Sequence, residues 1–504
     1  MTASPITATP ATAPDEAAPA ARAPNPAAPA VTATGTAWTV AERDPRDPRV
    51  RLQALFDPDS LRRLPAPDGC GVVSGHGRID GTPVVGYATD PRRRGGALGA
   101  RECTQIISAI GHALTERVPV IGLWHSGGAE LTEGVGSLHA VGSVFASMVR
   151  ASGKIPQISV ILGPAAGGAA YGPALGDLVV ISEHGRVFVT GPTVVRAVTG
   201  QDVDAEQLGG AEVHGRRSGL AHRVAGSEAT AIAEARALAG LLGRPGRFHP
   251  HRAGPEADPE ADLSALLPDN PRRAYDVRRL LPGLLDGPAV ELQARYAPSV
   301  VTALGRLTGR TVGVVANNPL RLGGCLNTES AEKAARFVRM CDCLGVPLVV
   351  LVDVPGYLPG VNQEWAGVVR RGAKLLHAFA EAVVPRVTLV TRKAYGGAYL
   401  AMNSRALGAT AVFAWPGAEV AVMAASAAVD VLHRRTLAAA PPQQRESLRA
   451  WLVRQQTRQA GGTDRAVRIG VVDEVIHPTQ TRRRLAQALA QAPAQAGRHT
   501  NIPL

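Results

Sequence analysis

The chain has 504 residues, of which 45% are hydrophobic and 19% charged, and it carries a formal net charge of +12. This length exceeds what one hydrophobic core usually serves and favours two or three globular domains. No apolar run reaches the roughly 20 residues that a membrane-spanning helix needs, and no basic start with an apolar core indicates a signal peptide. We therefore expect a cytoplasmic protein with no membrane segment.

The positive charge is spread along the chain, apart from the short runs at 91–96 and 481–484. Basic residues are not interleaved with aromatic ones, so we expect no nucleic acid partner and favour a small anionic ligand that carries phosphates. Five cysteines without a C-x-x-C pair indicate reduced thiols and no metal site. Only four of the 54 basic residues are lysines, which indicates positions that need a compact ammonium: Lys154, Lys333, Lys374 and Lys393.

Residues 1–36 are rich in Ala, Pro and Thr and predict a disordered tail. A short helix is expected within 44–57, followed by an α/β region from about 70 to 245. Pro, acidic and His residues in 246–275 indicate a linker, and a second α/β region runs from about 290 to 475 before a closing helix at 480–492. The expected domains are therefore an N-terminal one over 37–272 and a C-terminal one over 273–504.

Within each region a strand, a glycine-rich turn and a helix follow one another repeatedly. Apolar residues at helical spacing predict helices, for example over 101–116, 134–151 and 329–344. Repeating β–α units predict parallel strands with helices packed outside the sheet. The fold class is therefore α/β.

The second region repeats the first. The segment AAGGAAY around Gly167 returns as KAYGGAY around Gly396, at an offset of 229. HSGG, with Gly128, matches VPGY, with Gly356, at an offset of 228, and the segment 88–99 matches 316–327 at the same offset. Three matches in the same order indicate an internal duplication of one whole domain.

Glycine pairs at strand-to-helix turns expose backbone N–H groups where a negative charge is favoured. Two such turns on neighbouring strands would aim two donors at one oxygen and form an oxyanion hole in each half. The alternative is that the glycines only allow tight packing of helix on sheet. The sequence has no phosphate-binding loop, no H-E-x-x-H motif and no G-x-S-x-G motif, so no side-chain nucleophile or metal centre is indicated.

Several long motifs resemble the β subunits of biotin-dependent acyl-CoA carboxylases, of the actinobacterial acetyl-/propionyl-CoA carboxylase type. They include WHSGGAELTEGVGSLHAVG, IPQISVILGPAAGGAAYGPALGD, GGCLNTESAEKAARFVRMCD and TRKAYGGAY, and the resemblance covers about 40–504. It implies two duplicated crotonase-like (ββα spiral) carboxyltransferase domains. It also implies transfer of a carboxyl group from carboxybiotin to the α-carbon of a short acyl-CoA, giving malonyl-CoA or methylmalonyl-CoA.

The resemblance assigns one oxyanion hole to each half. The first, formed by Gly167 and Gly168 with a donor near Gly128 or Ala129, would polarise the thioester carbonyl of the acyl-CoA. The second would hold the ureido oxygen of biotin and is formed by Gly396, Gly397 and Ala398 with a donor near Gly356.

Further residues are expected to contact the substrate. Leu400 stands at a family position that faces the acyl chain, and an aliphatic side chain there fits a short apolar acyl group. The chain departs from the family at Glu130, where an Arg is usual, so the neighbouring arginines are expected to take over the phosphate contact. The full set is Tyr399, Leu400, Lys374, Lys393, Arg92, Arg93 and Arg94.

Neither an A-M-K-M biotinylation motif nor a biotin carboxylase region is present, so biotin must come on a separate α subunit. The resemblance implies a homo-hexamer with the active site between subunits, and the product fits both fatty acid biosynthesis and polyketide synthesis. Two alternatives stay open: a biotin-dependent acyl-CoA decarboxylase subunit or other crotonase-fold enzyme, and a non-catalytic scaffold of a carboxylase complex.

Overall fold

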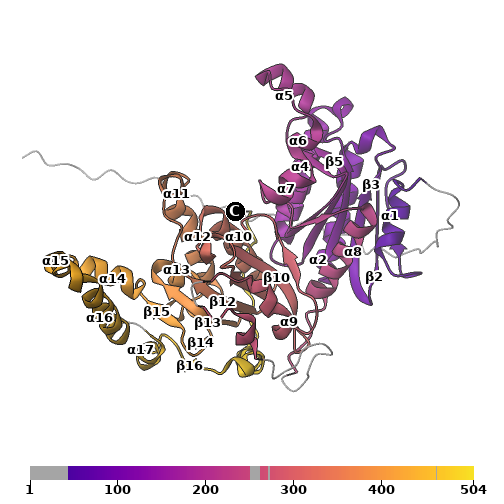
Figure 1. The fold of residues 1–504 in the computed structure, drawn as a ribbon. Helices are drawn as coiled ribbons and strands as arrows, with labels where there is room; N and C mark the ends of the chain where they lie inside the picture. Colours follow the sequence, from indigo (N-terminus) through magenta and orange to yellow (C-terminus); the bar gives the residue numbers. More distant parts are fainter. Residues whose placement is uncertain (1–43, 250–261, 271–272, 461, 504) are drawn as a thin grey trace, which may run out of the picture.

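The computed structural model describes residues 44–249, 262–270, 273–460 and 462–503, so the expected tail at 1–36 lies outside the described residues. Two α/β halves lie side by side, each built on an eight-stranded sheet (Figure 1). The first sheet has the order β1-β2-β3-β4-β5-β6-β8, with β7 on β5; the second has the order β9-β10-β11-β12-β13-β14-β16, with β15 on β13. The same order in both sheets confirms the duplicated α/β fold.

The strands of the two sheets occupy corresponding places in the chain. Those of the first sheet are β1 (Arg62–Arg63), β2 (Val72–Ile79), β3 (Thr82–Thr89), β4 (Val120–Ser126), β5 (Gln157–Ala166), β6 (Leu178–Ser182), β7 (Arg186–Phe188) and β8 (Arg223–Ala225). Those of the second are β9 (Val290–Leu292), β10 (Val300–Leu307), β11 (Arg310–Asn317), β12 (Leu348–Val354), β13 (Arg386–Tyr395), β14 (Ala411–Ala414), β15 (Glu419–Ala421) and β16 (Glu474–Val475).

Helices connect and cover the strands. In the first half they are α1 (Pro48–Leu55), α2 (Ala100–Glu116), α3 (Val135–Ala151), α4 (Gly168–Leu175), α5 (Pro192–Thr199), α6 (Ala205–Gly209), α7 (Ala211–Arg216) and α8 (Glu228–Gly243). In the second they are α9 (Leu281–Leu284), α10 (Thr328–Cys343), α11 (Val361–Trp365), α12 (Val368–Glu381), α13 (Gly396–Ala401), α14 (Ala425–Leu432), α15 (Arg434–Ala439), α16 (Pro442–Ala460), α17 (Thr463–Arg468) and α18 (Thr481–Gln491). The helices predicted at 44–57, 101–116, 134–151, 329–344 and 480–492 are therefore confirmed as α1, α2, α3, α10 and α18.

The prediction that the strands are parallel is wrong for the start of each sheet. β2 and β3 pair antiparallel, as do β10 and β11, whereas β3–β4–β5–β6 and β11–β12–β13–β14 are parallel. The two-residue turns Asp80–Gly81 and Thr308–Gly309 have positive φ at both positions, which is the geometry of a tight hairpin. These turns stand at equivalent places in the two halves and reverse the chain between β2 and β3 and between β10 and β11.

The two halves share a continuous core. One cluster of buried side chains joins first-half residues such as Leu52 and Leu238 to second-half residues such as Leu304 and Phe337. Leu263, within the predicted linker, is buried in a second cluster together with Leu281 and Val314 of the second half. Leu263 therefore packs with the core of the second half.

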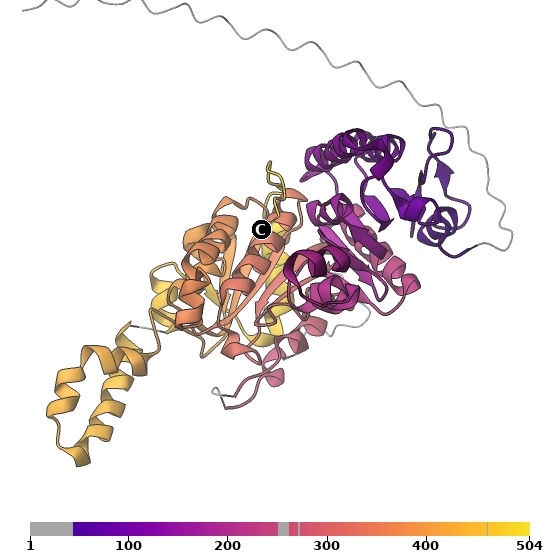
Figure 2. The ribbon, with the colours of Figure 1, turned by 90° about the horizontal axis from the view of Figure 1, so that it is seen from above.

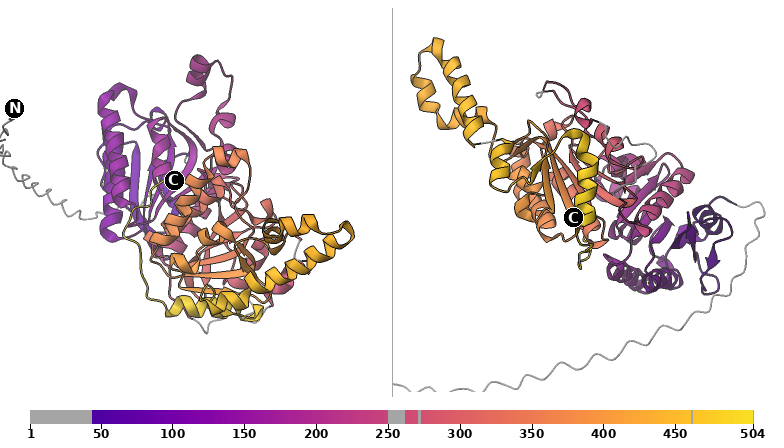
Figure 3. Two further views of the ribbon diagram at one scale, coloured as in Figure 1. Left: turned by 90° about the vertical axis from the view of Figure 1, so that its left-hand side faces the viewer. Right: turned by 90° about the horizontal axis from the view of Figure 1, so that it is seen from below.

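Two features depart from the symmetry of the halves. Helices α14–α16 form an arm that extends from the second half (Figure 2). At the equivalent place, between β7 and β8, the first half carries the short helices α5, α6 and α7. The C-terminal residues 492–503 leave α18 and run back toward the first half (Figure 3). No helix in the described part of the chain is long and apolar enough to cross a membrane.

Candidate active site

The glycine turns that follow β4 and β5 meet at one edge of the first sheet. The two strands are parallel neighbours, with Ser126 opposite Ala165. A Cβ on Gly128 would lie 2.9 Å from the carbonyl oxygen of Ala166, and its φ of 110° also requires glycine. This close approach brings the backbone after β4 beside the start of α4.

Hydrogen bonds decide which N–H groups are free at this edge. The N–H of Gly167 donates to the carbonyl oxygen of Phe188 (3.1 Å), and that of Gly128 donates to Oγ of Ser126 (3.2 Å). Among the described residues, the N–H groups of Gly168 and Ala129 have no acceptor. Of the four residues predicted for the first hole, these two therefore keep a donor for a ligand.

The second half repeats this arrangement after β12 and β13. Leu326 bridges Tyr357 as Leu98 bridges Ala129, so that Leu326 donates to the carbonyl oxygen of Gly356 and accepts from the N–H of Leu358. Within the described residues no acceptor faces the N–H of Tyr357, of Gly397 or of Ala398. The sequence reasoning missed Tyr357, although the offset between the halves relates it to Ala129.

Gly397 stands against open space. A Cβ built at this position meets no atom within 4 Å, and its φ lies outside the left-handed region. A carbonyl group could therefore approach its N–H closely, whereas any side chain would occupy the space that the carbonyl needs. Residue 397 fits a site for a ureido or other carbonyl oxygen.

Several residues are predicted to contact the acyl group or the substrate phosphates. Some of them are exposed, and others are buried or already paired within the chain. Leu400 lies on α13, shortly after Gly397, and is 46% exposed. Tyr399 is only 6% exposed and belongs to the main core, and burial raises the pKa of its phenol to about 12. Tyr399 thus packs in the core, and its hydroxyl has no hydrogen-bond partner within the described residues. That it contacts the substrate stays a prediction.

The two predicted lysines lie on different elements. Nζ of Lys374, on α12, is 2.6 Å from a carboxylate oxygen of Glu332, so this ammonium is already paired. Lys393 is partly buried on β13 and lines a cavity of about 380 Å³ together with Trp415 and Glu419. Neither lysine lies on the turns that carry the free N–H groups.

The arginine run beside the first turn is mostly used within the chain. Arg92 pairs with Asp90 (2.8 Å) and Asp47 (3.1 Å). Arg93 donates to the carbonyl oxygen of Gly69. These two guanidinium groups hold the loop in place.

Arg94 and the unusual Glu130 pair with each other at 2.7 Å. Hydrogen bonds from the backbone N–H and the hydroxyl of Thr132, together with Arg94, lower the pKa of Glu130. The carboxylate is therefore charged and is matched by a cation in the same loop. Glu130 thus holds the guanidinium of Arg94 beside position 130, where the family resemblance leads us to expect an Arg.

The comparisons with known proteins agree with this arrangement. The carboxyl transferase domain matches residues 53–501. The chain is 60% identical to the biotin-dependent acetyl-/propionyl-coenzyme A carboxylase beta6 subunit of Mycobacterium tuberculosis and 58% identical to the propionyl-CoA carboxylase beta chain of Rhodococcus erythropolis. Each match covers 92% of this chain and 97% of the relative.

A solved structure has the same fold. Transcarboxylase 12S, solved as a hexamer with methylmalonyl-coenzyme A bound, superposes with a TM-score of 0.84 at 40% sequence identity, covering 90% of this chain and 92% of the other. Two crotonase-like sheets with paired glycine turns define the class as a carboxyltransferase. The chain belongs to the carboxyl transferase domain family, as do the acyl-CoA carboxylase β subunits that it resembles.

Proposed function

We propose that this chain transfers a carboxyl group from biotin, carried by a separate subunit, to the α-carbon of a short acyl-CoA. The observation that carries the proposal is the pair of free N–H groups that recurs at equivalent places in the two halves. Two equivalent carbonyl sites suit a reaction that moves a carboxyl group from one carbonyl compound, a ureide, to another, a thioester.

In the first half, the N–H groups of Ala129 and Gly168 would donate to the thioester oxygen. When the α-proton leaves, negative charge develops on this oxygen, and fixed donors stabilise that charge more strongly than they stabilise the neutral carbonyl. The loss of one such donor typically lowers kcat by roughly 100- to 1,000-fold. The backbone supplies this stabilisation, and no side-chain nucleophile is needed.

In the second half, the N–H groups of Tyr357 and Gly397 would hold the ureido oxygen of biotin, with Ala398 as an additional donor. The open space at Gly397 fits such a group, because a Cβ would fill it. When bound, biotin supplies the carboxyl group and a ureido nitrogen able to accept the α-proton. The residues of this half orient and polarise it.

The acyl group is proposed to be short and apolar, because Leu400 presents an exposed aliphatic side chain beside the second turn. The relatives named for acetyl- and propionyl-CoA support these two substrates, with malonyl- and methylmalonyl-CoA as products. We place this reaction in the cytoplasm, as a supply of precursors for fatty acid biosynthesis.

A homo-hexamer is proposed for the chain, since transcarboxylase 12S forms one. Exposed apolar side chains on both halves support association with further copies: Leu131, Val135, Val198, Val361, Trp365, Val369, Val422 and Val431. The biotin-bearing α subunit is the second partner.

Carboxylation assays test this function. The purified chain is combined with a biotin-bearing carboxylase subunit, ATP and labelled bicarbonate, and acetyl-, propionyl- and butyryl-CoA are compared. We expect label in malonyl- or methylmalonyl-CoA and little in the butyryl product. Turnover only in the direction of decarboxylation would favour a decarboxylase subunit, and CoA binding without turnover would favour a scaffold.

A further inference from the structure

The helix α4, which carries the Gly168 donor at its first residue, is short and packs through small residues. It spans eight residues, and those that are buried are Ala169, Ala170, Gly172 and Pro173. Small side chains interlock little with a neighbouring sheet, so they fix the position of a helix along its axis only weakly. Pro173 also lacks the N–H that would bond within the helix. The position of α4 along its axis therefore depends on contacts at its ends.

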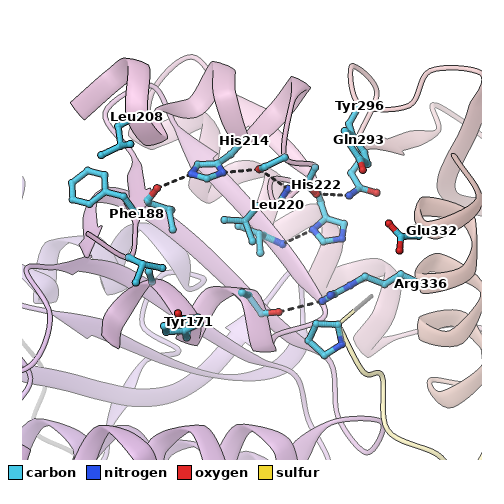
Figure 4. A pocket seen from close by; sticks show the side chains of 18 of the residues that line it. Tyr171, Phe188, Leu208, His214, Leu220, His222, Gln293, Tyr296, Glu332 and Arg336 are labelled. Carbon is cyan, nitrogen blue, oxygen red and sulfur yellow. Dashed lines mark hydrogen bonds between the residues drawn. The ribbon is translucent and has the colours of Figure 1, made fainter. Parts of the chain in front are cut away.

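A cation from the second half meets the C-terminal end of α4. One Nη of Arg336, on α10, donates to the carbonyl oxygens of Gly176 (2.7 Å) and Ala174 (3.4 Å). Figure 4 shows this side chain reaching toward the first half, with a dashed hydrogen bond to a carbonyl oxygen. The carbonyl end of a helix carries partial negative charge, so a guanidinium is a favourable partner there. Arg336 thus anchors the end of α4 that lies opposite Gly168.

The residue after this anchor is tied down as well. The carboxylate of Asp177 accepts the N–H of Gln157 (2.9 Å) and the side-chain amide of Asn501 (2.8 Å). Burial lowers the pKa of Arg336, and the charge of Asp177 opposes this shift. The end of α4 is therefore held between α10 of the second half and the C-terminal segment.

The second half does not repeat this anchor. The last turn of α13 is closed by its own chain, where the carbonyl oxygen of Tyr399 accepts the N–H of Met402 (3.0 Å). The offset of 228 between the halves relates Arg336 to Ser108, which has no charge. The anchor therefore belongs to the half that is proposed to hold the thioester.

We propose that Arg336 is a positioning residue, which fixes α4 from the second half and so aims the N–H of Gly168 at the thioester oxygen. This inference rests on the proposed carboxyl transfer and makes the acyl site of one half depend on a side chain of the other. A displacement of about 1 Å in an active site can cost roughly 100-fold in rate. A small shift of α4 would therefore weaken the polarisation of the thioester while acyl-CoA still binds.

The carbonyl stretch of bound acetyl-CoA measures this polarisation directly. Infrared difference spectra are recorded with acetyl-CoA isotopically labelled at the carbonyl carbon, free and bound to the full-length chain. Hydrogen bonds from the Ala129 and Gly168 N–H groups lower the stretching frequency. We expect Arg336→Met to lose at least half of this shift, while its affinity for acetyl-CoA stays within about twofold of that of the unaltered chain. An unchanged shift in this variant would overturn the proposal.

A matched variant separates positioning from stability. Arg310 is also partly buried with a pKa lowered by desolvation, and its Nη atoms donate to the carbonyl oxygens of Gly246 and Gly345 (both 2.8 Å), which are not part of α4. Arg310→Met should therefore lower the Tm much as Arg336→Met does but leave the carbonyl stretch unchanged. An equal loss of the shift in both variants would show a general loosening of the chain and would contradict the positioning role.

The conservative variant keeps the test decisive. Arg336→Lys retains a cation with a single donor group, so it should show a shift between those of Arg336→Met and the unaltered chain. Circular dichroism checks that each variant is folded. If Arg336→Met does not fold, a full shift in Arg336→Lys would overturn the proposal and a reduced shift would support it.

Transfer of label from malonyl-CoA to free biotin gives a second readout. For Arg336→Met we expect kcat to fall roughly 10- to 100-fold, with the KM values for malonyl-CoA and biotin changed by no more than about twofold. A raised KM for malonyl-CoA at unchanged kcat would make Arg336 a binding residue and contradict the proposal. If the unaltered chain binds no acetyl-CoA, the proposed function itself fails. If it binds acetyl-CoA with a shift that does not depend on Arg336, only the present inference fails.

Discussion

Lys333 holds three backbone carbonyl oxygens with one buried ammonium. Its Nζ lies 3.0 Å from the oxygens of Gln293 and Tyr296 and 2.7 Å from that of Val300, and the residue is 3% exposed. This convergence on one point explains why a chain with so few lysines keeps one here, since the planar fork of Arg spreads its donors. Lys154, by contrast, is exposed and has no such role.

We predict that Lys333→Met destabilises the chain by about 3 kcal/mol or more, because three buried acceptors lose their donor. Urea unfolding measures the change. Lys154→Met is the matched control, with an expected change within about 0.5 kcal/mol. Similar small changes in both variants would show that the three carbonyl contacts contribute little to stability.

His222 gives the stability a dependence on pH. Its pKa is about 3 in the folded chain, below the ordinary value of 6.5, because burial disfavours the charged ring. Between these pH values the unfolded chain binds more protons than the folded chain. The contribution of His222 to the free energy of unfolding is therefore fully present above pH 6.5 and is lost as the pH is lowered toward 3. The contribution lost by pH 5 is about 2 kcal/mol.

Unfolding in urea at pH 5.0 and 7.5 measures this loss. His222→Asn should show a smaller difference between the two pH values than the unaltered chain. Part of the difference should remain, because burial also lowers the pKa of His125 to about 4. An equal pH dependence in the His222 variant would contradict the argument.

At the scale of elements, the C-terminal segment ties the two halves together. The N–H of Asn501 donates to Oγ of Ser152 (2.9 Å), and its side-chain amide donates to the buried carboxylate of Asp177 (2.8 Å). On the second half, His499 contacts Asp342 of α10. Desolvation raises the pKa of Asp177, and the Asn501 hydrogen bond opposes this rise.

We predict that Asn501→Ala lowers the free energy of unfolding by about 2 kcal/mol, because a buried carboxylate loses a donor. Thermal unfolding at pH 7.5 checks the value. Ile502→Ala changes the neighbouring exposed residue and should have little effect. If the Ile502 variant is destabilised as much as the Asn501 variant, the side-chain hydrogen bond to Asp177 is not the anchor.

The helices and strands also show which parts of the fold can be predicted from the sequence. Helical periodicity predicted the long helices, because it is a local pattern. The constant offset between the halves predicted the duplication, because it compares one stretch of the sequence with another. The antiparallel pairing of β2 with β3 was missed, because alternating apolar residues are common to parallel and antiparallel strands. The free N–H groups could not be assigned, since Gly167 finds its acceptor at Phe188, on a different strand that only the folded sheet brings beside it.

At the scale of the whole molecule, large apolar side chains remain exposed on both halves. Trp365 on α11 is 84% exposed, and Leu131 and Val422 are also mostly exposed. Large apolar side chains exposed to this extent suit surfaces that other copies cover. Light scattering should therefore give about six times the 52.3 kDa of one chain.

A charged substitution in this surface tests the assembly. Trp365→Asp should shift the mass toward smaller species, because a carboxylate would be buried without a partner. His184→Asp, at another exposed position, should keep the large assembly. A monomeric mass for the unaltered chain at micromolar concentration would contradict the hexamer.

The central claim is that each half polarises a different carbonyl group. The most direct measurement is transfer of label from carboxyl-labelled malonyl-CoA to free biotin by the purified chain, comparing Gly168→Val and Gly397→Val with Gly111→Val. Like Gly397, Gly111 has no atom within 4 Å of a built Cβ, so it controls for the added side chain. The account predicts losses of roughly 100-fold or more in both turn variants and none in the control. Transfer at the unaltered rate by Gly397→Val would contradict it.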